Sequence, residues 1–340
     1  MSGIKNLSHY WYSKNFVATA LLPLSWLFRL LVVLRRTAYT QGLLQVHQLH
    51  IPVIVVGNIN VGGSGKTPLV IWLAGFLKKK GWSPGIISRG YGGQVREFSQ
   101  QVYADSDPAR VGDEAVLMAQ HADSPVMVDP DRARAARAIT NFCDIIISDD
   151  GLQHYALGRT IEIAVVDAVR RFGNGYCLPA GPLREPPSRL RDVDFVVSNG
   201  EPLTETLLSC YTSVRVKVDR MQLIGFEIIN LNNRLLVKLP MDFNGEAIHA
   251  VAGIGNPHRF FTYLSDLGLK IIEHPFPDHH QYVPEDLCFN DDKTIIMTEK
   301  DAVKCRAFSQ AHHWYLPVEA SLSEDFGERL LSLLARKRHG

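Results

Sequence analysis

The sequence predicts an α/β fold in which a mostly parallel sheet with helices on both faces is joined to a smaller second α/β domain. Short apolar runs rich in Val and Ile recur along the first part of the chain, which is typical of buried parallel strands. Several of them lead through a turn into an amphipathic segment, as crossover helices do. The 340 residues exceed one ordinary core and indicate two domains.

Charge and cysteine content argue against a nucleic-acid-binding protein and against a protein stabilised by disulfides or zinc. The formal net charge of +1 provides no basic field, so we expect no nucleic-acid partner. The five cysteines are odd in number and no pair has C-x-x-C spacing, which indicates free thiols rather than a disulfide framework or a zinc site.

The first expected element is an apolar helix at the N-terminus. Residues 16–34 nearly reach the length that crosses a bilayer, but Arg29 lies inside the run and Pro23 would kink it. Ser25, Arg29 and Arg36 fall close to one face of a helix, and basic and aromatic residues flank the run. Three interpretations stay open: a helix lying in the membrane interface, a spanning helix, and a helix packed on the protein's own core.

A glycine-rich loop follows the next element, a strand expected at residues 53–56, and leads into a helix that ends at Gly81. In this context glycines let backbone N–H groups point at phosphate oxygens, and the helix N-terminus adds its dipole. Lys66 would reach the β- and γ-phosphates, and the Thr67 hydroxyl would take Mg²⁺. The sequence therefore predicts a P-loop NTPase-like domain that binds a nucleoside triphosphate. The expected nucleotide-binding residues are Asn60, Val61, Gly62, Gly63, Ser64, Gly65, Lys66 and Thr67.

One loop position departs from the usual pattern G-x-x-x-x-G-K-[ST]. Asn60 stands where the pattern has its first glycine. Asn tolerates left-handed backbone better than most residues, so we expect the loop conformation to persist.

Two pairs of adjacent carboxylates are candidates for metal and base chemistry. Asp149 and Asp150 end the strand expected at 144–148, at the sheet edge where a P-loop needs an acidic partner for Mg²⁺, although Asp-Gly is also a common turn pair. Asp113 and Glu114 open an amphipathic helix, where they are ordinary first-turn residues or suit base and metal chemistry. The expected metal-side residues are Thr67, Glu114, Asp149 and Asp150.

Arginines in two loops are candidates for contacts with the acceptor substrate. Arg89 follows a strand expected at 85–88 and either contacts phosphate or is solvated. Arg184 and Arg189 lie in a long Pro-rich loop, and long loops inside compact domains are often functional. A solvated face is expected for Arg132, Arg134 and Arg137.

The texture of the chain changes near residue 210. Alternating apolar and polar residues then predict antiparallel strands or a hairpin between the domains. The expected segments are a membrane-associated helical segment at 1–36, the P-loop domain at 37–209, a β-hairpin linker at 210–240, and a smaller α/β domain at 241–340.

Two motifs of the second domain bear on chemistry. Gly253 and Gly255 form a lone G-x-G, which we interpret as a tight strand-to-helix turn. Asp278, His279 and His280 lie in a Pro-bounded loop without further metal ligands at diagnostic spacing. A catalytic or orienting histidine and ordinary surface histidines both remain open for this loop.

The chain resembles the tetraacyldisaccharide 4′-kinases, P-loop kinases that phosphorylate the lipid A precursor of Gram-negative bacteria. The resemblance rests on the order of NVGGSGKTP, SRGYGG, GDE, SDDGLQH, LPAGPLREP, the PDHH loop and TEKDAVKC, after the N-terminal apolar helix. It implies ATP and Mg²⁺ on the larger domain. It also implies phosphorylation of the 4′-hydroxyl of a tetraacylated glucosamine disaccharide 1-phosphate, giving lipid IVA, at the cytoplasmic face of the inner membrane.

The resemblance also implies roles for individual residues. Asp113 would be the base, and a histidine of the second domain, His279 or the adjacent His280, would assist it. Lys66 and Thr67 would contact phosphate and Mg²⁺. Because the histidine comes from the other domain, we expect the domains to close on nucleotide binding. We expect a monomer whose partners are the lipid substrate and the membrane.

Two other function classes remain open at this point. A membrane-associated P-loop ATPase or GTPase switch needs the same loop but no acceptor pocket. A soluble kinase of a small metabolite needs no membrane contact, and its N-terminal helix would simply pack on the protein.

Overall fold

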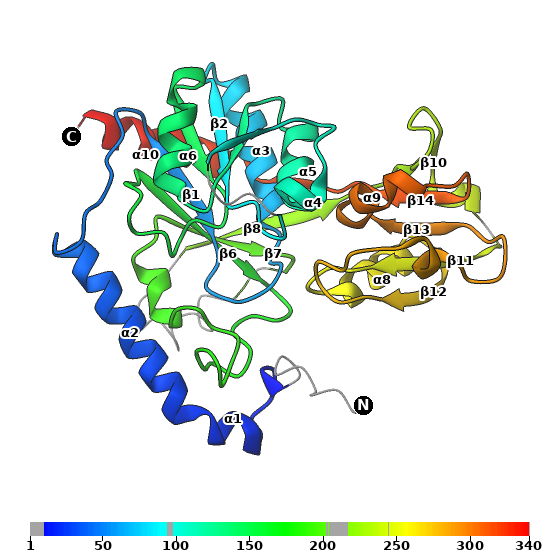
Figure 1. Cartoon of the computed structure of the whole chain (residues 1–340), viewed down its shortest axis with the longest axis horizontal. Helices are drawn as coiled ribbons and strands as arrows, with labels where there is room; N and C mark the ends of the chain where they lie inside the picture. Colours follow the sequence, from blue (N-terminus) through cyan, green and yellow to red (C-terminus); the bar gives the residue numbers. More distant parts are fainter. Residues whose placement is uncertain (1–9, 94–97, 202, 204–216, 244, 340) are drawn as a thin grey trace.

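The computed structural model describes residues 10–93, 98–201, 203, 217–243 and 245–339, which form two sheets in two adjoining lobes (Figure 1). Within these ranges, the larger sheet has nine strands in the order β15-β8-β7-β6-β1-β5-β2-β4-β3. The smaller sheet has six, in the order β10-β9-β14-β13-β11-β12. The lobes are called the large and the small domain below.

The centre of the large sheet is parallel, as the sequence predicts. Residues of β1 alternate between two cores, with Ile54 and Val56 in one cluster and Val53 and Val55 in the other. A strand buried on both faces has no polar side, which explains the continuous apolar run. The strands described up to residue 199 are β1 (Val53–Gly57), β2 (Pro84–Ser88), β3 (Gln100–Val102), β4 (Val126–Val128), β5 (Ile145–Ser148), β6 (Ile161–Asp167) and β7 (Phe195–Asn199).

Helices cover both faces of this sheet. On one face α3 (Lys66–Lys79), α5 (Asp113–His121) and α10 (Glu324–His339) contribute to the first core cluster. On the other, α6 (Arg132–Ile139) contributes to the second. Gly81, at φ +87°, follows the last turn of α3, which confirms the predicted C-terminal glycine. The short helical segments of the chain are α4 (Pro108–Val111), η2 (Thr140–Phe142), η3 (Pro187–Arg191), η4 (Pro240–Phe243), η5 (Pro284–Leu287) and η6 (Arg306–Phe308).

The small domain is a mixed sheet with α8 (Pro257–Asp266) and α9 (Glu299–Cys305). Its parallel strands continue the strand, turn and helix pattern seen in the sequence. The later strands are β8 (Val218–Ile224), β9 (Ile228–Asn230), β10 (Val237–Lys238), β11 (Ala247–Ala252), β12 (Lys270–Pro275), β13 (Ile295–Thr298), β14 (His313–Leu316) and β15 (Glu319–Leu322).

The predicted linker at 210–240 is not a single hairpin. β8 runs parallel to β7 in the large sheet, whereas β9 and β10 form an antiparallel hairpin in the small one. The predicted C-terminal domain is also too long, because β15 pairs with β8 and α10 packs on the large core. Alternation in the sequence shows that a segment is a half-buried strand but not which sheet it joins. The expected boundary at residues 209 and 210 lies outside the described residues.

The N-terminal segment forms α1 (Phe16–Ala20) and α2 (Leu22–Thr40), which lie along one edge of the large domain (Figure 1). The apolar run is not one continuous helix: it is interrupted at Leu21, and Pro23 occupies the first turn of α2, where its missing N–H is not needed. None of the described helices is both long and apolar enough to cross a membrane.

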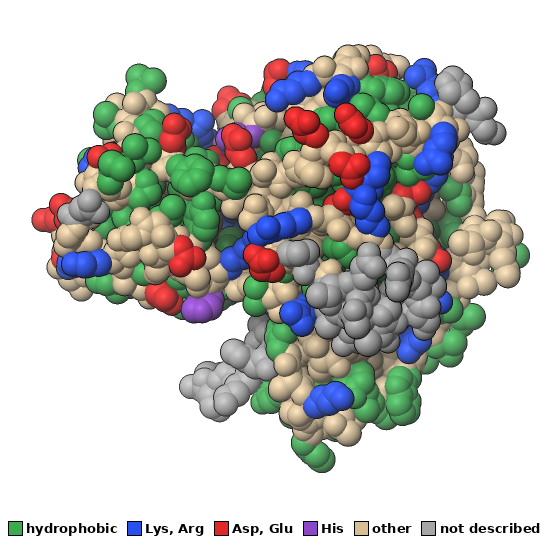
Figure 2. Space-filling model, turned by 180° about the vertical axis from the view of Figure 1, so that it is seen from behind, with side chains coloured by type: hydrophobic (Ala, Val, Ile, Leu, Met, Phe, Trp, Pro, Cys, Tyr) green, Lys and Arg blue, Asp and Glu red, His purple; other side chains and the backbone are tan. Residues whose placement is uncertain are grey.

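Ser25 and Arg36 of the expected polar stripe of α2 contact the protein, whereas Arg29 is exposed and several leucines of the helix face outward. Ser25 Oγ donates to the Cys177 carbonyl at 2.7 Å, and Arg36 Nη2 donates to Asp192 Oδ2 at 2.9 Å. The exposed side includes Leu30, Leu31 and Leu34, each with more than half of its surface exposed. Figure 2 shows hydrophobic side chains gathered along the lower outer edge of the large domain, where this helix lies.

Candidate active site

The glycine-rich loop between β1 and α3 has the geometry of a phosphate cradle. Gly62 and Gly65 have φ of +94° and +85°, so the backbone curls just before the first turn of α3. A Cβ on Gly65 would lie 2.2 Å from Asn199 Nδ2, so a side chain there has no room. Lys66 opens the helix and is 8% exposed. The backbone N–H groups of the loop, the positive end of the α3 dipole and the Lys66 ammonium group therefore lie around one point.

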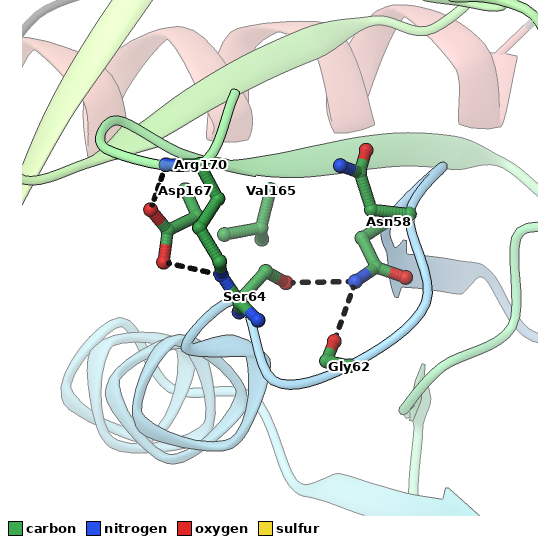
Figure 3. A pocket seen from close by; sticks show the side chains of 7 residues that line it. Asn58, Gly62, Ser64, Val165, Asp167 and Arg170 are labelled. Atoms are coloured by element: carbon green, nitrogen blue, oxygen red, sulfur yellow. Dashed lines mark hydrogen bonds and ion pairs between the residues drawn. The ribbon is translucent and has the colours of Figure 1, made fainter. Parts of the chain in front are cut away.

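Side chains that contact the loop fix its shape (Figure 3). Asn58 Nδ2 donates to the Gly62 carbonyl and to Ser64 Oγ, both at 3.1 Å, and Asn199 Nδ2 donates to the Ser64 carbonyl at 2.9 Å. Arg170 donates to the Gly63 carbonyl. Sequence reasoning missed Asn58, Arg170 and Asn199, although Asn58 and Asn199 stand at the carboxyl ends of β1 and β7, where ligands bind in open sheets.

Asn60 does not use its tolerance for left-handed backbone, because it is not among the described residues with positive φ. Its Nδ2 instead donates to the Arg171 carbonyl at 2.6 Å, and its backbone bridges to Leu183. The explanation predicted for the missing glycine is therefore wrong. At this position an ordinary backbone conformation suffices, and the side chain ties the loop to the neighbouring segment.

Asp149 and Asp150 meet the loop at the end of β5. Lys66 Nζ lies 3.4 Å from Asp150 Oδ1, and Arg184 Nη1 lies 2.9 Å from Asp150 Oδ2. Burial tends to raise the pKa of Asp150, but Lys66 and Arg184 outweigh it and hold that pKa below its usual range. Burial and then the nearby Glu114 carboxylate raise the pKa of Asp149 to about 7. Asp150 is thus firmly ionised, whereas Lys66 and Arg132 compensate the buried Asp149 carboxylate only in part.

The acidic group fits Mg²⁺ through its donor chemistry. Within the described ranges no group of three or more His, Cys, Asp or Glu side chains could hold a metal ion by itself. Asp149 Oδ1, however, is buried without a hydrogen-bond partner. Mg²⁺ is usually held by one or two carboxylates with substrate phosphates and water. A buried unpaired oxygen beside a phosphate cradle suits that mode.

Asp113 and His279 come together across the domain boundary. His279 Nδ1 lies 3.3 Å from Asp113 Oδ2, and Asp113 opens α5 with 5% of its surface exposed. Burial tends to raise the pKa of Asp113, but the hydrogen bond with His279 and the ammonium groups nearby hold it below its usual value. His280 pairs instead with Asp286 at 2.8 Å. Of the two adjacent histidines, His279 is the one that faces Asp113.

The candidate arginines have three different environments. Arg89 is exposed after β2, and Arg184 pairs with Asp150 beside the loop. Arg189 is 2% exposed and binds Glu162 at 2.5 Å, so its predicted role in acceptor binding is not available to it. The solvated face expected on α6 is also wrong for Arg132, which is buried and donates from Nη2 to the Asp149 carbonyl at 2.7 Å. Residue spacing could not show these buried carboxylate and carbonyl partners.

A cavity of about 890 Å³ separates the domains beside the phosphate loop. One wall carries Lys66, Thr67 and Glu114 of the large domain. The opposite wall carries Arg259 of α8 and Lys300 of α9. A nucleotide held by the loop would therefore meet side chains of both domains.

The turn at Gly255 contacts the phosphate loop directly. Arg170 Nη1 donates to the Gly255 carbonyl at 2.8 Å, and a Cβ on Gly255 would lie 2.6 Å from the Gly63 nitrogen. We expect Gly255→Ala to lower the kcat of the predicted phosphoryl transfer about 100-fold. The added Cβ would push the small domain away from the loop, and an ångström-scale shift of that domain misplaces His279. Steady-state kinetics would measure this, with the thermal unfolding midpoint as the folding control. Wild-type kcat in a folded variant would contradict it.

Comparisons with known proteins identify the family of the chain. The sequence profile of the family described as tetraacyldisaccharide-1-P 4′-kinase, LpxK, matches residues 17–335. A protein of Nitrosococcus oceani named tetraacyldisaccharide 4′-kinase is 52% identical over 327 residues, covering 96% of this chain and 93% of that protein. Its namesake in Methylobacillus flagellatus is 48% identical over 339 residues, covering 97% and 96%.

A solved structure matches over nearly the whole fold. LpxK from Aquifex aeolicus, determined in complex with ATP, superposes with a TM-score of 0.75 at 28% identity, covering 95% of this chain and 99% of that one. The mixed α/β fold with its large, mostly parallel sheet is therefore shared. On the evidence of its profile match and of relatives that align over almost its full length, the chain belongs to the tetraacyldisaccharide 4′-kinase family.

Proposed function

We propose that this chain is an ATP-dependent lipid kinase that phosphorylates the 4′-hydroxyl of a tetraacylated glucosamine disaccharide 1-phosphate. The product is the bisphosphorylated lipid A precursor of lipopolysaccharide biosynthesis. Family membership supports the activity and the substrate. The observation that carries the proposal is the pairing of Asp113 with His279 across the boundary beside the P-loop, since a base held by two domains suits a hydroxyl acceptor.

The donor half of the site binds the triphosphate. The loop amides and the N-terminus of α3 would hold its phosphates, and Lys66 would stabilise charge that develops on the transferred phosphoryl group. Thr67, Asp149, Asp150 and Glu114 are the residues proposed to hold Mg²⁺, which would neutralise phosphate charge. The raised pKa of Asp149 fits a carboxylate that is ionised most readily beside a cation.

The acceptor half removes a proton. Asp113 is ionised at neutral pH because its pKa is lowered, so Oδ2 can accept the proton of the 4′-hydroxyl. As that proton leaves, the 4′-oxygen forms a bond to the γ-phosphorus, and the bond from this phosphorus to the bridging oxygen breaks to release ADP. His279 holds Asp113 in place from the small domain. Closure of the domains would exclude water, the competing acceptor.

An ATPase or GTPase switch makes a different prediction from a kinase. A kinase should consume ATP slowly without acceptor and rapidly with the disaccharide 1-phosphate, because water is poorly placed for attack. Coupled ADP release with and without acceptor measures this difference. Equal rates under both conditions would favour the hydrolase class, which no contact at the site specifically supports.

The exposed face of α2 supports membrane docking. Leucines turned outward are costly in water, and a helix that presents leucines outward beside an exposed arginine suits the lipid interface. We therefore propose that the enzyme acts at the cytoplasmic face of the bacterial inner membrane. That the enzyme acts as a monomer and without nucleic acid stays a prediction.

Membrane docking can be tested on this face. Leu30→Glu with Leu34→Glu is expected to weaken binding to phosphatidylethanolamine–phosphatidylglycerol vesicles about 100-fold, since each buried leucine contributes about 1.5–3 kcal/mol. Vesicle flotation measures binding, and kcat on detergent-dispersed substrate should persist. Leu235→Glu with Met241→Glu is the control, because these side chains are even more exposed, at 91% and 66%, but lie on the small domain. Equal flotation of both double variants would contradict docking through α2.

A further inference from the structure

Lys300 is a charged side chain that crosses from the small domain to the large one. It lies in the first turn of α9, and its side chain is 14% exposed. Its Nζ donates to Glu114 Oε1 at 3.0 Å and lies 3.9 Å from Asp113 Oδ2, both on α5. The same nitrogen lies 3.4 Å from Asp278 Oδ1 and 3.4 Å from His279 Nε2.

The charges around Lys300 explain why a cation is needed there. Asp113 and Glu114 of the large domain lie opposite Asp278 of the small domain, so closing the domains brings carboxylates of the same sign together. Within a protein such charges repel strongly at a few ångströms, because the effective dielectric is low. One ammonium group within 4 Å of all three carboxylates reverses the sign of this interaction.

Lys304, one turn further along α9, does not duplicate this contact. Its Nζ lies 2.8 Å from Asp301 Oδ1 in its own domain and is 3.9 Å from Asp113 Oδ2. Lys300 is therefore the α9 lysine that forms a hydrogen bond to the large domain. That bond also places its ammonium beside the imidazole nitrogen of His279 that faces away from Asp113.

We propose that Lys300 is a positioning residue for phosphoryl transfer, whose ammonium group joins α5 to the Asp278–His279 loop and so holds His279 against Asp113. The inference rests on the proposed function and adds a residue to it. Lys300 also lines the cavity between the domains, but its ammonium group lies among three carboxylates, so its effect on the reaction is exerted through the Asp113–His279 pair. A further contact joins α5 to the end of α9, because Arg306, the residue that caps α9, donates from Nη2 to Gln120 Oε1 at 2.9 Å, so the interface does not depend on Lys300 alone.

Kinetics of the full-length enzyme with ATP, Mg²⁺ and the lipid disaccharide test this role. Lys300→Gln is expected to lower kcat about 100-fold, because misplacement of the Asp113–His279 pair affects the transition state. Arg306→Gln removes a neighbouring contact between the same helices and should leave kcat near wild type. Thermal unfolding midpoints confirm that each variant is folded.

A double-mutant cycle separates positioning from a merely structural role. In a His279→Ala background, Lys300→Gln should cost less than about 3-fold in kcat, because residues that act as one unit are not additive. Lys300→Arg keeps the charge and should recover at least a tenth of wild-type kcat. A full 100-fold cost in the His279→Ala background would overturn the inference, and so would Lys300→Arg being as slow as Lys300→Gln.

The activity of the wild type distinguishes a failure of the proposed function from a failure of the inference about Lys300. A wild type that transfers no phosphate contradicts the proposed function, and this inference with it. An active wild type with an unaffected Lys300→Gln variant contradicts this inference alone.

Discussion

Asp113→Ala is expected to lower kcat about 1,000-fold, within the range that general-base removal usually costs. The carboxylate sits at the start of α5 with its oxygen facing His279, and no other described carboxylate pairs with that ring at hydrogen-bond distance. The KM for ATP should change little, because Asp113 does not line the nucleotide cavity. Initial rates at varied ATP and lipid concentrations measure both parameters.

Asp113→Asn serves as the matched variant. It preserves size and can still hydrogen-bond to His279, but it cannot accept a proton at neutral pH. It should therefore be nearly as slow as Asp113→Ala while keeping the unfolding midpoint of the wild type. Turnover near the wild-type rate in either variant would show that another group is the base.

Lys66→Ala is expected to lower kcat about 100- to 1,000-fold and also to raise the KM for ATP. The ammonium group is buried at the start of α3, where a preorganised positive charge stabilises the phosphoryl group more than water can. Loss of Lys66 would also remove one of the two cations that pair with Asp150 and leave Arg184 as the other. Steady-state kinetics and direct nucleotide-binding measurements separate the two effects.

Lys78→Ala is the control for this prediction. Lys78 lies on the same helix but is exposed at its far end and pairs with Asp123. Exposed ion pairs contribute little, so both activity and nucleotide binding should stay near wild type. Comparable losses in both variants would mean that α3 as a whole, and not the Lys66 charge, explains the effect.

Much of the large domain could be predicted from the sequence because its elements carry local signals. β1 reads as an apolar run, the loop reads through its glycines, and Gly81 marks the end of α3. The placement of Asp149 and Asp150 follows from one topological rule, since carboxyl ends of parallel strands share an edge. These predictions needed no knowledge of distant contacts.

The remaining features depend on partners far along the chain. β15 joins the large sheet through β8, and nothing in its sequence distinguishes that partner from the small sheet. Arg189 is buried because Glu162 and Glu185 lie beside it. Arg132 is buried because its guanidinium reaches the Asp149 carbonyl. Burial of a charge is decided by its compensating partner, which spacing does not reveal.

At the site between the domains, too, the sequence identifies candidate residues but not their contacts. The sequence identifies Asp113 and the two adjacent histidines as candidates, and the structure brings His279 rather than His280 to Asp113. Lys300 lies in the TEKDAVKC motif, whose sequence does not indicate what this lysine contacts. Only the packing of α5 against α9 reveals that it meets three carboxylates.

The central claim is that phosphate passes from ATP to the 4′-hydroxyl of a lipid disaccharide. The most direct measurement incubates the purified enzyme with γ-labelled ATP, Mg²⁺ and detergent-dispersed tetraacylated disaccharide 1-phosphate, then locates the label by mass spectrometry and phosphorus NMR. The account predicts label at the 4′ position of a bisphosphorylated lipid, dependent on Mg²⁺ and lost in Asp113→Ala. Label released only as inorganic phosphate, at the same rate with and without the lipid, would contradict it.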